Sequence, residues 1–166
     1  NDLDKLYTLA DPQISPDGKS VLLVASLPDT TINKRKSFVY KVDAATGATH
    51  QLTYDRTLVS SPRWSPLGNE IAFIAADATG KGQIFVLSTN GGDARKITNS
   101  PTGVQQFSWS PDTTTFAFVQ EDEIPTKKEV EKGYDAFEIK NNSMFLNVKP
   151  NPSHIWLIPV GGGEAK

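Results

Sequence analysis

The chain has 166 residues, a formal net charge of −2 and a hydrophobic content of 37 %, so it is long enough for one domain with a core and shows no clustered basic surface of the kind that binds nucleic acids. It contains no cysteine, which excludes disulfides, thiol catalysis and cysteine-ligated metals. Its longest apolar run, residues 71–76, is too short to cross a membrane.

The first twelve residues predict a short helix followed by a lead-in. Leu3, Leu6 and Leu9 are three residues apart, which places them on one face of a helix. The Asp11-Pro12 pair would end such a helix, because proline disfavours helical backbone in the residue before it. We therefore expect a helix within residues 2–10 that lies on the body of the domain.

One turn sequence then occurs three times. Ser15-Pro16-Asp17-Gly18 returns as Ser65-Pro66-Leu67-Gly68 and again as Ser110-Pro111-Asp112-Thr113, so that the Ser-Pro pairs are 50 and 45 residues apart. Proline presets the backbone of a turn, and glycine accepts its final positive φ. A repeat of this length indicates stacked supersecondary units and matches the four-stranded blade of a β-propeller.

Short strands separated by turns follow each copy. In the first two units we expect strands at 20–26, 37–42, 49–53, 63–65, 70–76, 83–88 and 95–98, with a polar loop at 28–36. The middle strands are apolar at consecutive positions, which indicates that both faces of the sheet are covered, as in a blade between two neighbours. A buried helical segment is the alternative, but the runs are short, rich in Val, Ile and Phe and bounded by turns, which favours strands.

The third unit departs from this pattern. Thr113 replaces the turn glycine, so we expect a strained turn or one of another type. An insertion at 121–151 separates its second and third strands. Within it, the capping-box spacing of Thr126-Lys127-Lys128-Glu129 predicts a helix near 127–132. The third strand resumes at 153–159, and a fourth is expected to begin near Ala165.

These elements predict an all-β fold, a partial β-propeller with two complete four-stranded antiparallel blades and most of a third. Its parts are the helix and lead-in at 1–12, blades at 13–53 and 61–98, and an incomplete blade at 106–166 that carries the insertion 121–151. Because propellers close with about four to eight blades, we expect the chain to be the front part of a longer protein. An unclosed propeller exposes blade faces, so self-association of the isolated segment is expected.

Three segments resemble one known family. They are Leu3 to Ser26 with its stretch Ala10 to Lys19, Tyr134 to Glu138 in the insertion, and Ser153 to Leu157 before the glycine-rich turn. They are similar to the amino-terminal propeller of serine peptidases of the prolyl oligopeptidase family, in the acylaminoacyl-peptidase and dipeptidyl-aminopeptidase-like branch. The resemblance implies a propeller that caps a carboxy-terminal α/β-hydrolase domain and limits access to a Ser-Asp-His triad in that domain.

The segment itself should not be catalytic. No Gly-x-Ser-x-Gly elbow occurs in the sequence, so no catalytic residue is predicted, and whether the parent protein is an enzyme depends on the resemblance alone. The most suggestive cluster is Glu121-Asp122-Glu123, where the insertion begins. Some dipeptidyl peptidases of this family bind the free amino terminus of a substrate with paired acidic residues, and carboxylates suit an ammonium group. The alternative is a solvated run of charges at the start of a loop.

Neither a metal nor another cofactor is predicted. His50 and His154 are the only histidines and have no acidic residue at metal-ligand spacing, so we interpret them as ordinary strand residues. Trp64 and Trp109 occupy equivalent positions of the repeat, which indicates packing between blades, and Trp156 is expected in the core beside apolar neighbours.

The function implied by the resemblance is to gate a serine peptidase and to select its peptide substrates. The alternative is a non-enzymatic propeller of the Tol type that binds proteins in the cell envelope, since Tol-type propellers share the Ser-Pro-Asp-Gly repeat. The chain begins with Asn1 rather than methionine, which slightly favours a periplasmic or secreted protein over a cytoplasmic one.

Overall fold

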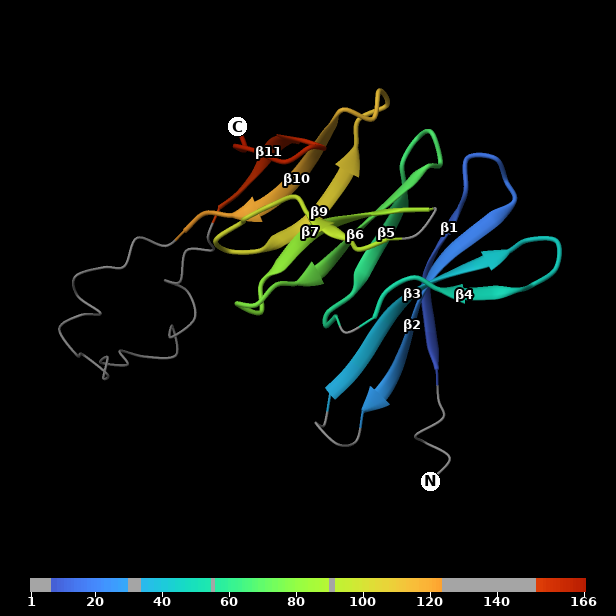
Figure 1. The fold of residues 1–166 in the computed structure, drawn as a ribbon. Helices are drawn as coiled ribbons and strands as arrows, with labels where there is room; N and C mark the ends of the chain where they lie inside the picture. Colours follow the sequence, from blue (N-terminus) through green and yellow to red (C-terminus); the bar gives the residue numbers. More distant parts are fainter. Residues whose placement is uncertain (1–6, 30–33, 55, 90–91, 124–151) are drawn as a thin grey trace, which may run out of the picture.

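Three antiparallel sheets make up the computed structural model, which describes residues 7–29, 34–54, 56–89, 92–123 and 152–166 (Figure 1). Blade 1 contains β1 (Thr8–Ile14), β2 (Ser20–Asp29), β3 (Lys34–Asp43) and β4 (Thr49–Gln51). Blade 2 contains β5 (Ser60–Trp64), β6 (Glu70–Ala76), β7 (Gly82–Ser88) and β8 (Arg95–Lys96). Blade 3 contains β9 (Val104–Trp109), β10 (Thr115–Glu121) and β11 (Ser153–Pro159). The described residues contain no helix that is long and apolar enough to span a membrane.

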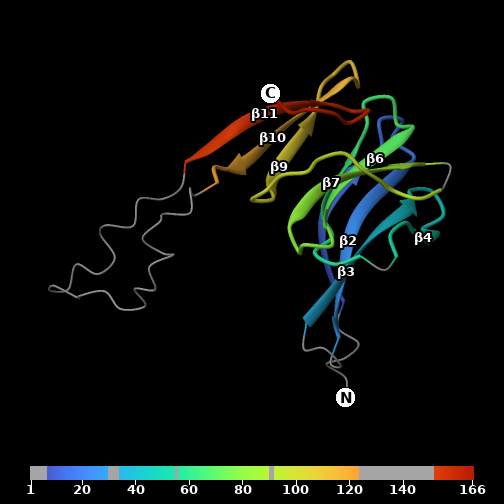
Figure 2. The same cartoon turned by 60° about the vertical axis from the view of Figure 1, so that its left-hand side comes forward.

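The sheets lie side by side as successive blades, seen from two directions in Figures 1 and 2. Within each blade the strands follow chain order, so every connection is a hairpin between neighbours. The first strands lie together, because β5 contacts both β1 and β9, whereas β4 and β8 form the opposite edges of their sheets. This arrangement confirms the all-β, propeller-like fold expected from the repeat.

The expected amino-terminal helix is not present in the described residues. From Thr8 onward the segment is strand β1, and Leu9 pairs with Ala25 of β2, while residues 2–6 lie outside the described residues. The Asp11-Pro12 pair forms a bulge in this strand, with φ of 51° at Asp11, and does not end a helix. Backbone hydrogen bonds to β2 hold this segment as a strand, which the leucine spacing did not reveal.

The strands of blade 2 are apolar at consecutive positions because each face of its sheet packs against a neighbouring blade. Along β6, Ile71, Phe73 and Ala75 join a core shared with blade 1, whereas Ala72 and Ile74 join a core shared with blade 3. Because successive side chains of a strand point to opposite faces, the continuous apolar run covers both faces. The interpretation of these runs as strands between two neighbouring blades is therefore confirmed.

Blade 1 extends further than predicted. Strands β2 and β3 continue as far as Asp29 and Lys34, and Asp29 pairs with Lys34 in register, so most of the polar loop expected at 28–36 belongs to the ladder. Lys36 also forms an ion pair with Asp29, with 2.6 Å between Nζ and Oδ2. Polar residues occupy this end of the hairpin because it reaches beyond the core between the blades.

The three Ser-Pro turns share one hydrogen-bond pattern. The N–H of the fourth turn residue donates to the serine carbonyl oxygen at 2.9 Å in blade 1, 2.8 Å in blade 2 and 3.0 Å in blade 3. That fourth residue has positive φ in each turn, 72° at Gly18, 73° at Gly68 and 61° at Thr113. The predicted strain at Thr113 is thus confirmed: the turn keeps its type, and a β-branched residue adopts the left-handed conformation.

Replacing Thr113 with glycine should stabilise the domain by about 1 kcal/mol. The left-handed conformation costs a residue with a Cβ about 1–2 kcal/mol, and glycine removes this cost. Glycine also raises the conformational entropy of the unfolded chain, which offsets part of the gain in stability. Urea unfolding of Thr113→Gly measures the difference, and Gly68→Thr provides the reciprocal variant, which should lose stability. Loss of stability in Thr113→Gly would contradict this account.

A repeated threonine follows the end of β4 and of β8 by two residues. The hydroxyl oxygen of Thr53 accepts a hydrogen bond from the Val39 N–H, and that of Thr98 accepts one from the Ile84 N–H, both at 2.9 Å. These two threonines therefore occupy the same position in successive blades. In blade 3, Lys166 and Leu157 exchange two backbone hydrogen bonds of 2.9 and 2.8 Å, which is the pairing expected where a fourth strand begins near Ala165.

Candidate functional site

The acidic run predicted as a binding site lies at the end of β10. Glu121 is the last residue of that strand and pairs with Ser153, the first residue of β11. Asp122 follows, and its backbone N–H donates to the Pro152 carbonyl oxygen at 2.9 Å. These residues form the root of the third-blade insertion; the helix predicted near 127–132 lies outside the described residues.

The two carboxylates at this root have different partners. An Oε1 of Glu121 accepts a hydrogen bond of 2.9 Å from the side-chain amide of Gln105 in β9. An oxygen of Asp122 lies 2.8 Å from Nδ1 of His154 in β11. Consecutive side chains in an extended segment point to opposite sides, so Glu121 and Asp122 diverge. Glu123 is exposed and lies one residue further along the chain.

His154 has a partner that sequence spacing did not reveal. It is 32 residues from Asp122 in the chain, yet antiparallel pairing of β10 with β11 brings the two side chains together. The imidazole is 60 % exposed and the carboxyl group 39 % exposed, so the pair lies in solvent and contributes little to stability. Across the described residues, no three metal-ligating side chains gather at one point.

Aspartates of the turns have lowered pKa values. The Ser15 hydroxyl donates to Oδ1 of Asp17 at 2.6 Å, and the Lys19 N–H donates to the same oxygen, which together hold the pKa of Asp17 below 3.8. Ser110 and Thr114 hold the pKa of Asp112 below 3.8 in the same way. These hydrogen bonds favour the charged carboxylate, and both aspartates stabilise their turns.

Stability should therefore fall in acid through these turns. A folded pKa below the unfolded value contributes stability that is complete above about pH 4 and is lost as the pH falls through the folded pKa. Measuring Tm from pH 5 to pH 2.5 should show a shallower decrease in the Asp17→Asn/Asp112→Asn double variant than in the wild type. Leu67→Asn, at the equivalent position of blade 2, should leave the slope unchanged. Identical slopes for the wild type and the double variant would contradict the assignment.

Trp64 and Trp109 pack between blades as their equivalent positions in the repeat predict, and Trp156 packs against a core as expected from the sequence. The indole N–H of Trp64 donates to the Gln13 carbonyl oxygen of blade 1 at 3.0 Å. Trp109 packs on the core between blades 2 and 3, with its ring centroid 4.3 Å from that of Phe116, and Trp156 packs on the same core. All three serve blade packing and leave no stacked aromatic platform exposed.

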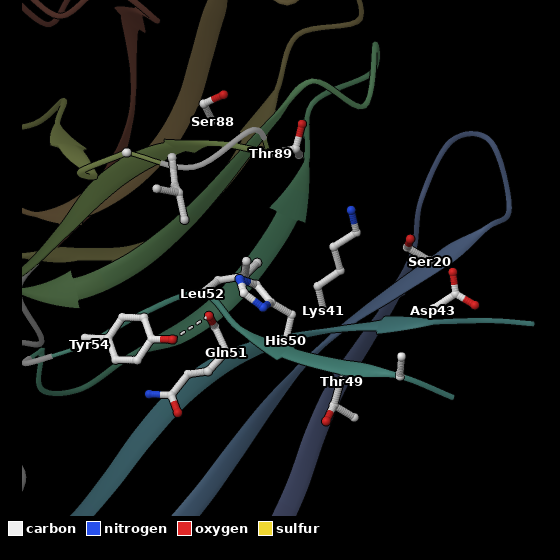
Figure 3. Close-up of a pocket in the computed structure, with 13 residues that line it drawn as sticks. Ser20, Lys41, Asp43, Thr49, His50, Gln51, Leu52, Tyr54, Ser88 and Thr89 are labelled. Carbon is white, nitrogen blue, oxygen red and sulfur yellow. Dashed lines mark hydrogen bonds between the residues drawn. The ribbon is translucent and has the colours of Figure 1, made fainter. Parts of the chain in front are cut away.

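A second place of interest is a cleft between blades 1 and 2 (Figure 3). It has a volume of about 620 Å³ and lies between the outer strands of blade 1 and the end of β7 in blade 2. Its polar lining includes Lys41 and His50, which are paired across β3 and β4, and Thr89 on the opposite wall. Leu52 and Leu87 supply apolar surface. In Figure 3, Lys41 and His50 extend from the blade 1 strands toward the side where Thr89 lies.

This cleft was not found by sequence reasoning. The sequence predicts His50 as an ordinary strand residue and does not distinguish Lys41 from its neighbours. The signal that could have found Lys41 is its place in a repeat: aligned on the Ser-Pro turns and strand pairs, it corresponds to Val86 in blade 2, so a charge stands where the neighbouring blade has a core residue. Only the pairing of strands makes this correspondence secure.

Comparisons with known proteins agree with the blade architecture. Residues 4–142 match the family model described as the TolB beta propeller domain. The chain is 30 % identical over 175 residues to the uncharacterized peptidase YuxL of Bacillus subtilis (strain 168), covering all of this chain and 27 % of that protein. It is 28 % identical over 114 residues to dipeptidyl-peptidase 5 of Porphyromonas endodontalis, covering 69 % of this chain and 16 % of that protein.

The fold is also that of a solved peptidase structure. The acylaminoacyl peptidase of Pyrococcus horikoshii superposes with a TM-score of 0.72 at 20 % identity, over 99 % of this chain and 26 % of that one. The chain thus spans about a quarter or less of each of these peptidases and corresponds to their propeller part. By the match over residues 4–142, the chain belongs to the TolB β-propeller domain family.

Proposed function

We propose that this chain is the gating and substrate-selecting part of a serine peptidase whose hydrolase domain lies outside this sequence. The observation that carries the proposal is the similarity to the peptidase YuxL along the whole chain, combined with a match to only 27 % of that relative. A propeller of rigid blades can act by exclusion: it leaves a narrow path through which peptides pass and folded proteins do not. No nucleophile or base from this chain is needed for that role.

The root of the third-blade insertion is where we expect peptide substrates to be selected. Hairpin connections between second and third strands of the blades all leave the same face of the propeller, and the insertion between β10 and β11 starts there. The Ser-Pro turns between first and second strands lie on the opposite face. An insertion on the face that carries the connections between second and third strands can shape the entrance for peptide substrates without disturbing the cores between blades.

The gating role is testable in the complete protein. A fluorophosphonate probe should label a serine of the hydrolase domain, and peptides should be cleaved with a kcat/KM far above that for casein. Replacing residues 124–151 by two glycines, which the hydrogen bond between Asp122 and Pro152 can accommodate, should reduce this preference for short peptides. An unlabelled protein, or one that cleaves casein and peptides equally, would refute the proposal.

The acidic residues at the root are the second part of the proposal: Glu121 and Glu123 bind the free amino terminus of the substrate. Charge-assisted hydrogen bonds of this kind are strong, so Glu121→Gln and Glu123→Gln should raise KM about tenfold for peptides with a free amino terminus. KM for acetylated peptides should not change. The exposed Glu164 of the same blade offers the matched control, Glu164→Gln. Equal effects on free and acetylated peptides would exclude this role.

A non-enzymatic role as a protein-binding module of the cell envelope is the second candidate. The match to the TolB beta propeller domain favours it. The same labelling experiment separates the two candidates, because a binding module carries no reactive serine. Its complete protein would instead form a stable complex with an envelope protein, measurable by co-purification after cross-linking in cells.

A further inference from the structure

The outer part of the gap between blades 2 and 3 is filled by side chains of both blades. Val86 of β7 is 1 % exposed and belongs to the shared core. Next to it, Arg95 of β8 donates to the Val160 carbonyl oxygen of blade 3 at 2.5 Å and forms an ion pair of 3.2 Å with Glu70. An apolar residue and a bridging guanidinium thus close this gap.

The gap between blades 1 and 2 has the same backbone but different side chains. Ser20 and Glu70 are equivalent because each N–H donates to the turn serine hydroxyl, and the strand registers then align the remaining positions. Thr89 and Val160 are equivalent because each N–H donates to the carbonyl oxygen of the residue just before the second strand of its blade. That residue is Asn69 before β6 and Thr114 before β10. Glu70, Val86, Arg95 and Val160 of the filled gap therefore correspond to Ser20, Lys41, His50 and Thr89.

These four replacements open the cleft between blades 1 and 2. Serine is shorter than glutamate, and histidine cannot reach across the gap as Arg95 does. Lys41 puts a cation where the repeat otherwise has a core valine. All four residues line the cavity of about 620 Å³. A departure from the repeat that gives up packing at one place marks a site kept for function rather than for stability.

The chemistry of the cleft favours an anion. Among the described residues Lys41 forms no ion pair, and its ammonium lies 5.9 Å from the centroid of the Trp64 ring. The neighbouring Asp43 uses Oδ1 to accept three hydrogen bonds within its own turn, from the Ala45 N–H and from the N–H and hydroxyl of Thr46. Asp43 attracts Lys41 electrostatically but forms no ion pair with it, so a carboxylate entering beside Lys41 would gain a direct charge-assisted contact.

The edge of β4 favours a peptide as the carrier of that carboxylate. β4 is the last strand of its sheet. In its ladder with β3, the backbone bonds from Asp43 to Ala48 and from Leu52 to Val39 fix the register. The N–H and C=O of Thr49 and the N–H of Gln51 consequently point away from β3, as an exposed sheet edge that can pair with an extended segment.

We propose that the cleft between blades 1 and 2 binds an acidic peptide segment in extended conformation, with a carboxylate beside Lys41 and His50 and with its backbone along β4. The volume of about 620 Å³ exceeds what a single free carboxylate fills and lies within the range of ligand pockets. Leu52, which lines the cleft and is partly buried, receives an apolar side chain next to the acidic one. The site lies on the outer rim of the blades, so it does not depend on the proposed peptidase role.

The test uses a phage-displayed library of seven-residue peptides, panned on the complete protein. We expect the enriched sequences to contain Asp or Glu beside an apolar residue. A synthetic enriched peptide should bind Lys41→Gln about tenfold more weakly than wild type by fluorescence polarisation. It should bind Lys19→Gln, an equal change of charge outside the cleft, as tightly as wild type. Binding should weaken as salt increases.

A second variant fills the cleft with the side chains that fill the gap between blades 2 and 3. Ser20→Glu/Lys41→Val/His50→Arg places the residues of the blade 2–3 gap between blades 1 and 2. This variant should lose binding while its Tm stays equal to or above that of wild type, which separates loss of the site from loss of the fold. Enrichment without acidic residues, or equal binding by wild type and either cleft variant, would overturn the proposal.

Discussion

We expect Phe73→Ala to lower the free energy of unfolding by about 3–5 kcal/mol, because it removes a large aromatic side chain from the core between blades 1 and 2. Phe73 is fully buried in β6, and its ring stacks on that of Phe85 with 6.0 Å between centroids and 18° between planes. Leu22 and Val39 of blade 1 belong to the same core. Blade 2 has a neighbour on each side, so its strands cannot collapse into the cavity that alanine would leave.

Urea unfolding followed by tryptophan fluorescence measures this effect, since Trp64 packs against the same core. The matched control is Leu157→Ala in β11, where the side chain is 52 % exposed on the uncovered face of blade 3. Its loss should cost about 0.5 kcal/mol or less. If both variants lost equal stability, Phe73 would not occupy the interior position that this core requires.

Much of the fold could be predicted because its information is local. The Ser-Pro turns and the apolar runs of β6 and β7 recur at a fixed spacing, and each blade is built from consecutive hairpins, so neighbouring strands in the sequence are neighbours in the sheet. Leu9 was misinterpreted for the opposite reason. The leucine spacing of three suits a helix, but Leu9 pairs with Ala25 of β2, and this ladder supplies hydrogen bonds that a short helix could not make.

The candidate sites depend on contacts between residues that are distant in the chain, and these could not be predicted. The acidic run at the insertion root was visible in the sequence, yet the partners of Glu121 and Asp122 come from β9 and β11. The cleft between blades 1 and 2 is even harder to predict from the sequence, because no residue that lines it is unusual by itself. Lys41 becomes informative only when strand register shows that its counterpart is the buried Val86.

The two uncovered faces lead to the second prediction, that the 166-residue chain associates head to tail in solution. On blade 1, Tyr7 and Leu9 are 61 % and 65 % exposed and line a shallow apolar hollow with residues of β2 and β3. On blade 3, Ile155 and Leu157 are 74 % and 52 % exposed. Between blades 1 and 2 and between blades 2 and 3, faces of this kind are packed together, so the free face of one copy matches that of another.

Sedimentation velocity should therefore show sizes that grow with concentration until the rotation between successive copies closes a ring, because a contact between two different faces leaves one face free at each end of an unclosed assembly. Leu9→Asp should block the blade 1 face and Leu157→Asp the blade 3 face, and each variant alone should be a monomer. Mixed together, the two variants retain one compatible pair of faces and should form a one-to-one dimer that grows no further. Dimers of either variant alone would indicate pairing of identical faces, and a wild-type monomer at all concentrations would contradict association altogether.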